Sequence, residues 1–272
     1  MAYDHEGTAL PITPELQEIT EYLEVIIDRF DHIWGEEIRP QNPRFESHTA
    51  SVFMMWLLMR QVESVICLAR RDLILLPGAL PIARTAFETG IKILWMLDPD
   101  DPYEREVRWL TYLKTEEDFH RKLGKEIGNT KHDEAESIRD FRVRIEGLLL
   151  NKYKLYKQLP NFRQILQEIG EERKYSLYIM LSQYNHSTHA ATSLYRKGIG
   201  RSVEVKDITS SGDWKIPLSA CYFGFASAGC RIIQRWGEDP NKLLSDDLKR
   251  KIDAAFNKVI GTDLWQLPLS SL

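Results

Sequence analysis

Arg84 and Glu88 form the first pair of residues in this chain whose types and spacing could do chemistry. They lie four positions apart in a mostly apolar segment, so a helix would place them on one face. Charged side chains in such surroundings are seldom buried unless they are paired. Arg84 could therefore hold an anionic group through its fork of donors, with Glu88 orienting it. The alternative is an ion pair that only stabilises the fold, although Arg before Glu is the less favourable order within a helix.

A second polar set lies later in the chain, where Ser182, His186 and His189 occupy positions i, i+4 and i+7 of an aromatic-rich segment. A helix would align them in one stripe. Near pH 7 an imidazole can act as a general acid or base, as a metal ligand or as a donor to phosphate. We expect His186 to be the acid–base group, with His189, Ser182 or Tyr184 assisting. The alternative is that these histidines make structural hydrogen bonds or face solvent.

Basic residues follow this segment, namely Arg196, Lys197 and Arg201, among several glycines. Their pattern predicts a flexible loop that could close over an anionic ligand. The alternative is a solvated loop with ordinary surface charges.

A metal site would need more than two histidines, because zinc sites use at least three protein ligands. Glu88 could complete a set with His186 and His189, but nothing in the sequence demands such a set. We therefore expect neither a metal ion nor a cofactor.

Several nucleotide-binding and hydrolytic motifs are absent from the sequence, including GxxxxGK[ST], GxGxxG after a strand, and HExxH. No histidine has an arginine five to seven positions upstream, which is the spacing that helical HEPN ribonucleases carry. One Glu117-x-x-His120 spacing occurs, and we expect it to lie on a solvated helix face.

The composition favours a soluble cytoplasmic protein. The 36 basic and 40 acidic residues, for a net charge of −4, argue against an extended track for a phosphate backbone. Cys67, Cys221 and Cys230 each lie in an apolar stretch and are predicted to be reduced core thiols. The first residues lack a signal-peptide pattern. The apolar runs are shorter than the roughly 20 residues that span a bilayer, so we expect no membrane segment.

Helical periodicity and stop signals predict an all-α fold, an irregular bundle of about eight main helices. One long loop or small hairpin is expected near residues 196–215. We expect a single domain over residues 1–272, with a C-terminal helical pair, residues 216–260, docked on the main bundle. The expected helices cover residues 14–34, 47–76, 81–97, 103–127, 133–156, 160–169, 174–195, 217–236 and 239–259.

A set of short motifs runs through the same region: Leu80-Pro-Ile-Ala-Arg84, Phe87-Glu88, Leu94-Trp95-Met-Leu97, Arg108-Trp-Leu-Thr-Tyr112, Tyr178, Leu181-Ser182 and His186. This set resembles the prokaryotic domain-of-unknown-function 5677 family, over roughly Phe53 to Tyr195. The resemblance implies an all-helical fold that brings Arg84, Glu88 and His186 to a shared polar site. It implies no activity.

Two functions remain open on the sequence, so it does not decide whether the chain is an enzyme. In the first, a cytosolic prokaryotic protein cleaves RNA or another phosphodiester without a metal, as a toxin or defence effector. In the second, the chain is a non-catalytic module that binds a small anionic ligand or a protein partner. The polar cluster would then be structural, and the tryptophans would lie in the core or in a face that forms a homo-oligomer.

Overall fold

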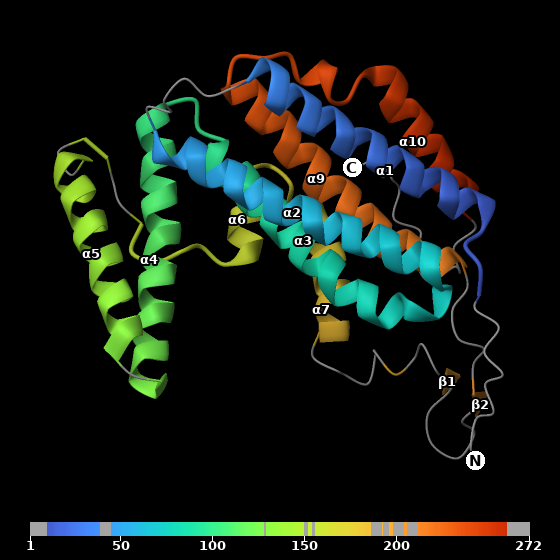
Figure 1. The fold of residues 1–272 in the computed structure, drawn as a ribbon, viewed down its shortest axis with the longest axis horizontal. Coiled ribbons are helices and arrows are strands. Elements are labelled where there is room, and N and C mark those ends of the chain that lie inside the picture. Colours follow the sequence, from blue (N-terminus) through green and yellow to red (C-terminus); the bar gives the residue numbers. More distant parts are fainter. Residues whose placement is uncertain are drawn as a thin grey trace. The chain divides into compact units, whose positions relative to one another are not determined.

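The computed structural model describes residues 10–38, 45–127, 129–149, 152–153, 156–185, 192, 196–197, 204–205 and 211–259. Within these residues the fold is all-α, as predicted (Figure 1). The exception is one antiparallel pair of two-residue strands, β1 (Arg196–Lys197) and β2 (Glu204–Val205), in the region where a loop or hairpin was expected.

The chain divides into two compact units, each built from separate stretches of sequence. Helices α2 (Glu46–Arg71) and α3 (Leu76–Leu97) contribute residues to both units. The single domain and the docked C-terminal pair therefore stay predictions. Unit 1 consists of Met1–Arg39, Met55–Ile91 and Arg173–Leu272, and unit 2 consists of Pro40–Met54 and Lys92–Glu172.

Unit 1 is centred on α9 (Lys215–Arg235), which is buried along most of its length. Helix α1 (Pro14–His32) packs against both α9 and α10 (Asp246–Lys258) (Figure 1). The two outer helices begin where their caps dictate, because Thr13 and Ser245 accept hydrogen bonds from backbone N–H groups in the first turns of α1 and α10. Each outer helix is amphipathic and buries one apolar stripe, which leaves α9 as the element surrounded by core.

Two glycines allow a close contact between α3 and α9 in unit 1. A Cβ atom added at Gly90 of α3 would lie 2.2 Å from the carbonyl oxygen of Gly224 in α9. A Cβ atom at Gly224 would lie 2.9 Å from the carbonyl oxygen of Ala86. Since both obstacles are backbone atoms, the two helices can cross this closely only where neither residue carries a side chain.

We expect Gly90→Ala to lower the free energy of unfolding by about 3 kcal/mol or more, because α3 and α9 must move apart. Gly78→Ala, in the same helix, is the matched control, since a Cβ there meets no atom within 4 Å. The control should be neutral or more stable by about 1 kcal/mol, as expected for Gly to Ala in a helix. Urea denaturation of both variants measures the difference, and equal stability of the two would contradict the close crossing.

The start of α3 differs from the prediction. Residues 47–76 and 81–97 were expected to be two helices separated by Pro77 and Gly78. Instead, Asp72 adopts an extended conformation, and its side chain accepts from the backbone N–H of Ile74, which ends α2 and starts a 3-10 turn. Pro77 then falls in the first turn of α3, where its missing N–H costs no helical hydrogen bond. Pro81 lies inside the helix.

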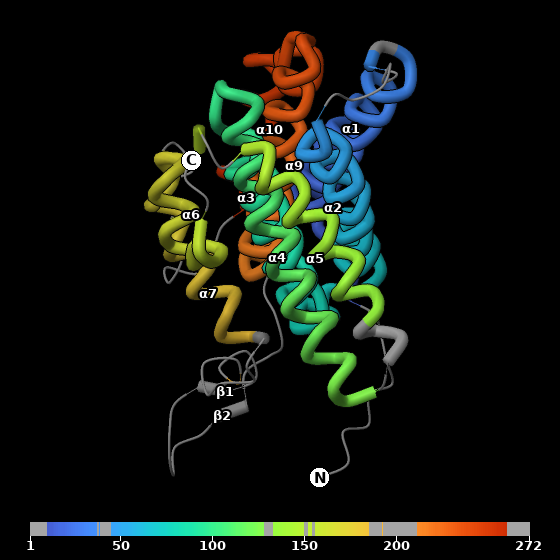
Figure 2. Tube along the Cα trace, turned by 90° about the vertical axis from the view of Figure 1, so that its left-hand side faces the viewer, coloured from blue at the N-terminus to red at the C-terminus, as the bar shows by residue number. Residues whose placement is uncertain are grey.

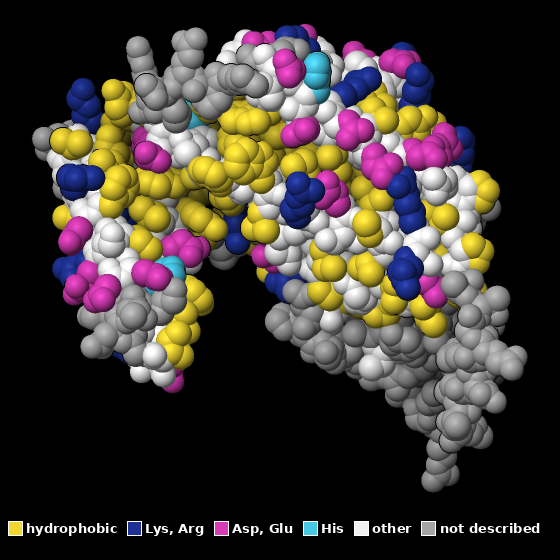
Figure 3. Space-filling view, in the orientation of Figure 1, with side chains coloured by type: hydrophobic (Ala, Val, Ile, Leu, Met, Phe, Trp, Pro, Cys, Tyr) yellow, Lys and Arg dark blue, Asp and Glu magenta, His cyan; other side chains and the backbone are white. Residues whose placement is uncertain are grey.

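One face of α2 is exposed, although the helix is rich in apolar residues. Phe53, Trp56 and Leu57 are 59%, 40% and 56% exposed, and Cys67 is exposed on the same helix. Hydrophobic side chains gather at the surface over this helix (Figure 3). The prediction of a core thiol at Cys67 is therefore wrong, whereas Cys221 is buried. The reason is the helical repeat of 3.6 residues, which turns only one stripe of α2 inwards however apolar the rest.

Among the described residues, two stretches, α2 and Ser211–Arg235, are long and apolar enough to cross a membrane by length and composition alone. In α2, 44% of the most apolar 18-residue segment is buried inside the protein. In Ser211–Arg235 the corresponding buried share is 83%. The core helix of a soluble protein passes the same test, so this is weak evidence. The absence of a membrane segment and the cytoplasmic location stay predictions.

In unit 2, α4 (Pro102–Ile127) and α5 (Asn129–Leu149) run side by side as a helical hairpin (Figures 1 and 2). The short helix α6 (Phe162–Glu168) follows. The helix predicted at 133–156 begins four residues earlier and ends at Leu149, where a turn forms because the backbone N–H groups of residues 152 and 153 both donate to its carbonyl oxygen.

Glu117, expected on a solvated face, is buried between α4 and α5. Its carboxylate lies 3.1 Å from Nε of Arg142, which also pairs with Glu146. Burial acts to lower the pKa of Arg142, but the hydrogen bonds that Arg142 donates to the two carboxylates outweigh it and raise the pKa. Glu117 is therefore part of a structural ion-pair cluster, while His120 Nδ1 makes a separate contact of 2.9 Å with Glu134.

Glu106 links α4 to the start of α2, since its carboxylate accepts a hydrogen bond of 2.8 Å from the backbone N–H of Ser47. Burial raises the pKa of Glu106 above the ordinary carboxyl value of 4.5. The folded protein therefore binds this proton more readily than the unfolded chain does. The resulting stabilisation is fully present below pH 4.5 and is lost as the pH rises through the raised pKa.

We expect Glu106→Gln to remove this loss, because the amide oxygen can still accept from Ser47 and carries no charge. The free energy of unfolding of the variant, minus that of the wild type, should rise as the pH increases from 4.5 towards neutrality. Urea denaturation at a series of pH values tests this. A difference that is constant with pH would show that burial does not penalise the charged carboxylate.

Candidate functional site

The candidate site lies in unit 1, where α3 meets α7 (Tyr175–Asn185). Helix α3 packs its apolar face through Ala83 and Phe87, which are fully buried. Arg84 and Glu88 come directly after these core positions, so they lie at the edge of the packed face. Their side chains are 13% and 24% exposed.

Arg84 is held on three sides by described residues. Its Nε lies 2.8 Å from Oε1 of Glu88, although the N–H is not aligned for a hydrogen bond, so this contact is an ion pair. Its Nη2 donates to the hydroxyl of Tyr178 at 3.2 Å. Its Cζ lies 5.1 Å from the centroid of the Tyr178 ring, which gives a cation–π contact. The predicted Arg84–Glu88 pair therefore exists, and Tyr178 of α7 fixes its orientation.

Ser182 and Tyr184 lie on α7, but their described interactions do not include the ion pair. The hydroxyl of Ser182 donates to the carbonyl oxygen of Tyr178 at 2.7 Å, so its proton is engaged in the helix. Burial raises the pKa of Tyr184, and the charge of Asp213 raises it further. Tyr184 is therefore a neutral phenol near pH 7.

The remaining predicted site residues are not placed. His186, His189 and Arg201 lie outside the described residues, and for Arg196 and Lys197 only the backbone of β1 is described. Within the part of the chain that the structure describes, no histidine pairs with Arg84 or Glu88. The convergence of His186 on this cluster stays a prediction.

Sequence reasoning missed two residues of this region as site candidates. Tyr178 carries the contact to Arg84, and its signal was its position four residues before Ser182 on one helix stripe. Lys174 is 2% exposed, and its Nζ lies 4.8 Å from the centroid of Phe223. No sequence pattern predicts the burial of Lys174, because its cation–π contact is with Phe223 of α9, which is distant in the sequence.

Among the described residues, no group of three or more His, Cys, Asp or Glu side chains is placed to hold a metal ion. Cys221 and Cys230 are free thiols. Burial raises the pKa of Cys230 to about 11 and that of Cys221 further. Both are therefore protonated near neutral pH.

Comparison with known protein families gives one match. The family model of DUF5677, a family of unknown function, matches residues 48–198, which is more than half of the chain. The chain belongs to the DUF5677 family. The resemblance predicted for Phe53 to Tyr195 is thus confirmed, and the DUF5677 region contains Arg84, Glu88 and Tyr178. No curated protein and no solved structure gives a significant match.

We expect removal of either charge of the Arg84–Glu88 pair to destabilise the DUF5677 fold. Arg84→Ala should lower the free energy of unfolding by about 3 kcal/mol, because Glu88 would be left mostly buried without its cation. The double variant with Glu88→Ala should cost less than the sum of the two single variants. Thermal or urea denaturation closes this cycle, and strictly additive effects would show that the two charges do not interact.

Proposed function

We propose that the Arg84–Glu88–Tyr178 cluster binds a small anionic ligand, and that Arg84 is the residue that holds it. The observation that carries this proposal is the state of the Arg84 guanidinium. Glu88 and Tyr178 fix its Nε and Nη2 edges, while Nη1 makes no hydrogen bond to any described residue. The Arg84 side chain retains 13% exposure, so its remaining donors can be reached.

The geometry suits anion binding because the arginine is oriented before the ligand arrives. A guanidinium fixed by an ion pair and an aromatic ring loses little conformational freedom on binding. Its planar fork matches the oxygens of a phosphate or a carboxylate. Glu88 offsets part of the charge of Arg84, and the donors that remain on Nη1 favour a ligand with acceptor oxygens.

Metal-independent RNA cleavage stays a prediction of the sequence. It needs a general acid or base beside the anion. The groups expected to serve, His186 and His189, lie outside the described residues. The described cluster supports binding of an anion, so we propose binding and not cleavage.

The test is isothermal titration calorimetry, in which the protein is titrated with inorganic phosphate and, separately, with a ribonucleoside 5′-monophosphate. Arg84→Lys keeps the charge but loses the planar fork, and we expect it to raise Kd about tenfold or more. Arg163→Ala is the matched control, because this exposed arginine forms a surface ion pair with Glu172. It should bind like the wild type.

Circular dichroism shows whether each variant is folded, so that a binding loss is read only from folded protein. Failure of both phosphate compounds to bind the wild type, or equal binding by Arg84→Lys, would make the cluster a purely structural one.

A further inference from the structure

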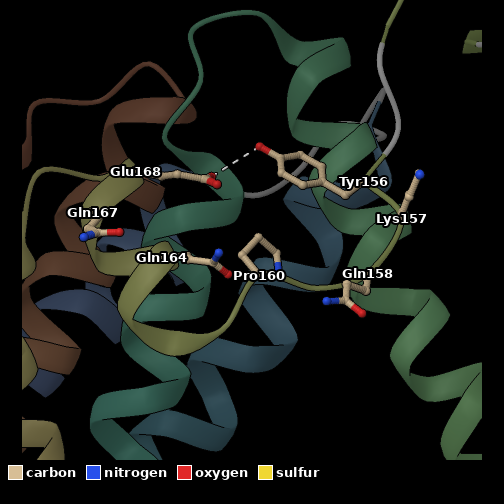
Figure 4. A pocket seen from close by; sticks show the side chains of 7 residues that line it. All are labelled: Tyr156, Lys157, Gln158, Pro160, Gln164, Gln167 and Glu168. Carbon is tan, nitrogen blue, oxygen red and sulfur yellow. Dashed lines mark hydrogen bonds between the residues drawn. The ribbon is translucent and has the colours of Figure 1, made fainter.

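A second polar cluster, in unit 2, surrounds Glu168 at the end of α6. Its Oε2 accepts a hydrogen bond of 2.6 Å from the indole Nε1 of Trp95 and one of 3.2 Å from the hydroxyl of Tyr156. Nη2 of Arg108 lies 3.6 Å from the same oxygen. One carboxylate oxygen is thus held by three donor groups from different parts of the unit, of which Figure 4 shows Tyr156.

The donors are themselves fixed by packing. Trp95 is almost fully buried, and Cζ of Arg108 lies 5.0 Å from the centroid of its ring. Arg108 also donates to the backbone carbonyl oxygen of Trp95. The ring of Tyr156 meets that of Trp95 edge to face at 5.7 Å. The carboxylate of Glu168 therefore has one orientation, as a preorganised binding group requires.

The other oxygen of Glu168, Oε1, makes no hydrogen bond to any described residue. The side chain is 32% exposed and lines a cavity of about 400 Å³. This volume is within the range of sites for small molecules. We call it the Glu168 cavity, and its lining residues are Tyr156, Lys157, Gln158, Pro160, Gln164, Gln167 and Glu168.

The lining is rich in neutral groups that both donate and accept hydrogen bonds. Gln158 makes no hydrogen bond to a described residue. Gln164 uses its oxygen to cap α6, and Gln167 uses its amide nitrogen to bind Glu172, so each keeps its other polar atom. The ammonium of Lys157 points away from the other lining side chains (Figure 4).

This chemistry selects a neutral, polyhydroxylated ligand. Arg108 offsets the charge of Glu168, so the cavity has no strong preference for a cation. A hydroxyl can donate to a carboxylate and accept from an amide, which is the pairing this lining offers. Carboxylates bind sugar hydroxyls in this way in dinucleotide sites. The rings of Tyr156 and Pro160 provide apolar walls for the C–H face of a sugar.

We propose that the Glu168 cavity binds the vicinal hydroxyls of a sugar ring, with Oε1 of Glu168 as acceptor and the glutamine amides as partners. The sugar belongs either to a free monosaccharide or to the ribose of a nucleoside. Both present the same diol, so the experiment separates them.

Trp95 provides the readout, because its indole N–H donates to the carboxylate that meets the ligand. Its cross-peak in a ¹⁵N-resolved NMR spectrum of the full chain is followed while ribose, glucose, adenosine or 2′,3′-dideoxyadenosine is added. We expect the Trp95 peak to shift with at least one diol-bearing compound, at about millimolar Kd. A shift with ribose or glucose identifies the monosaccharide, and a shift with adenosine alone identifies the nucleoside.

Two variants locate the site. Gln158→Ala should raise Kd several-fold, and it removes a side chain with no described partner, so the fold does not depend on it. Gln234→Ala, at an exposed position of α9, is the matched control and should leave Kd unchanged. Glu168→Gln should weaken binding further.

Three outcomes would overturn the proposal: no shift with any diol-bearing compound, an equal shift with the dideoxynucleoside, or an unchanged Kd in Gln158→Ala. None of these bears on phosphate binding by Arg84.

Discussion

Unit 1 depends on one steric constraint, the contact of Gly90 with Gly224, where the backbones of α3 and α9 meet. Because no side chain separates the two helices, α3 is pressed against the buried central helix, and its polar edge residues stay near the surface of the unit. Helix α7 also packs on α9, so the two helices that carry Arg84 and Tyr178 share one support. A larger residue at the crossing would move the arginine relative to its aromatic partner.

Three carboxylates of the charged clusters each lie beside an arginine, whereas the buried carboxylate of Glu106 is held by a backbone N–H group instead. Glu88 pairs with Arg84, Glu117 pairs with Arg142, and Glu168 lies near Arg108. Such pairing is stabilising because an isolated charge in apolar surroundings costs several kcal/mol. The Glu117 pair is enclosed by two helices and is structural, whereas the other two retain donors or acceptors that point outwards. That difference, rather than the ion pairs themselves, separates candidate sites from structural ones.

Both candidate sites, the Arg84 cluster and the Glu168 cavity, lie within residues 48–198, the part of the chain that matches the DUF5677 family. One site offers an oriented cation and the other a fixed carboxylate with neutral amides. An anion and a sugar diol are complementary to these two chemistries. The two sites lie in different units.

The sequence by itself determined the all-α class, most helix positions and the Arg84–Glu88 pair, since periodicity, caps and i, i+4 spacing are local properties. It failed where position in the fold decided the outcome. The residue types of Cys67 and Glu117 do not reveal which side of a helix meets a neighbour. Tyr178 over Arg84, and Trp95 with Tyr156 around Glu168, join residues distant in the chain. Only tertiary packing brings such groups together, because residues that meet across the fold have no regular spacing in the sequence.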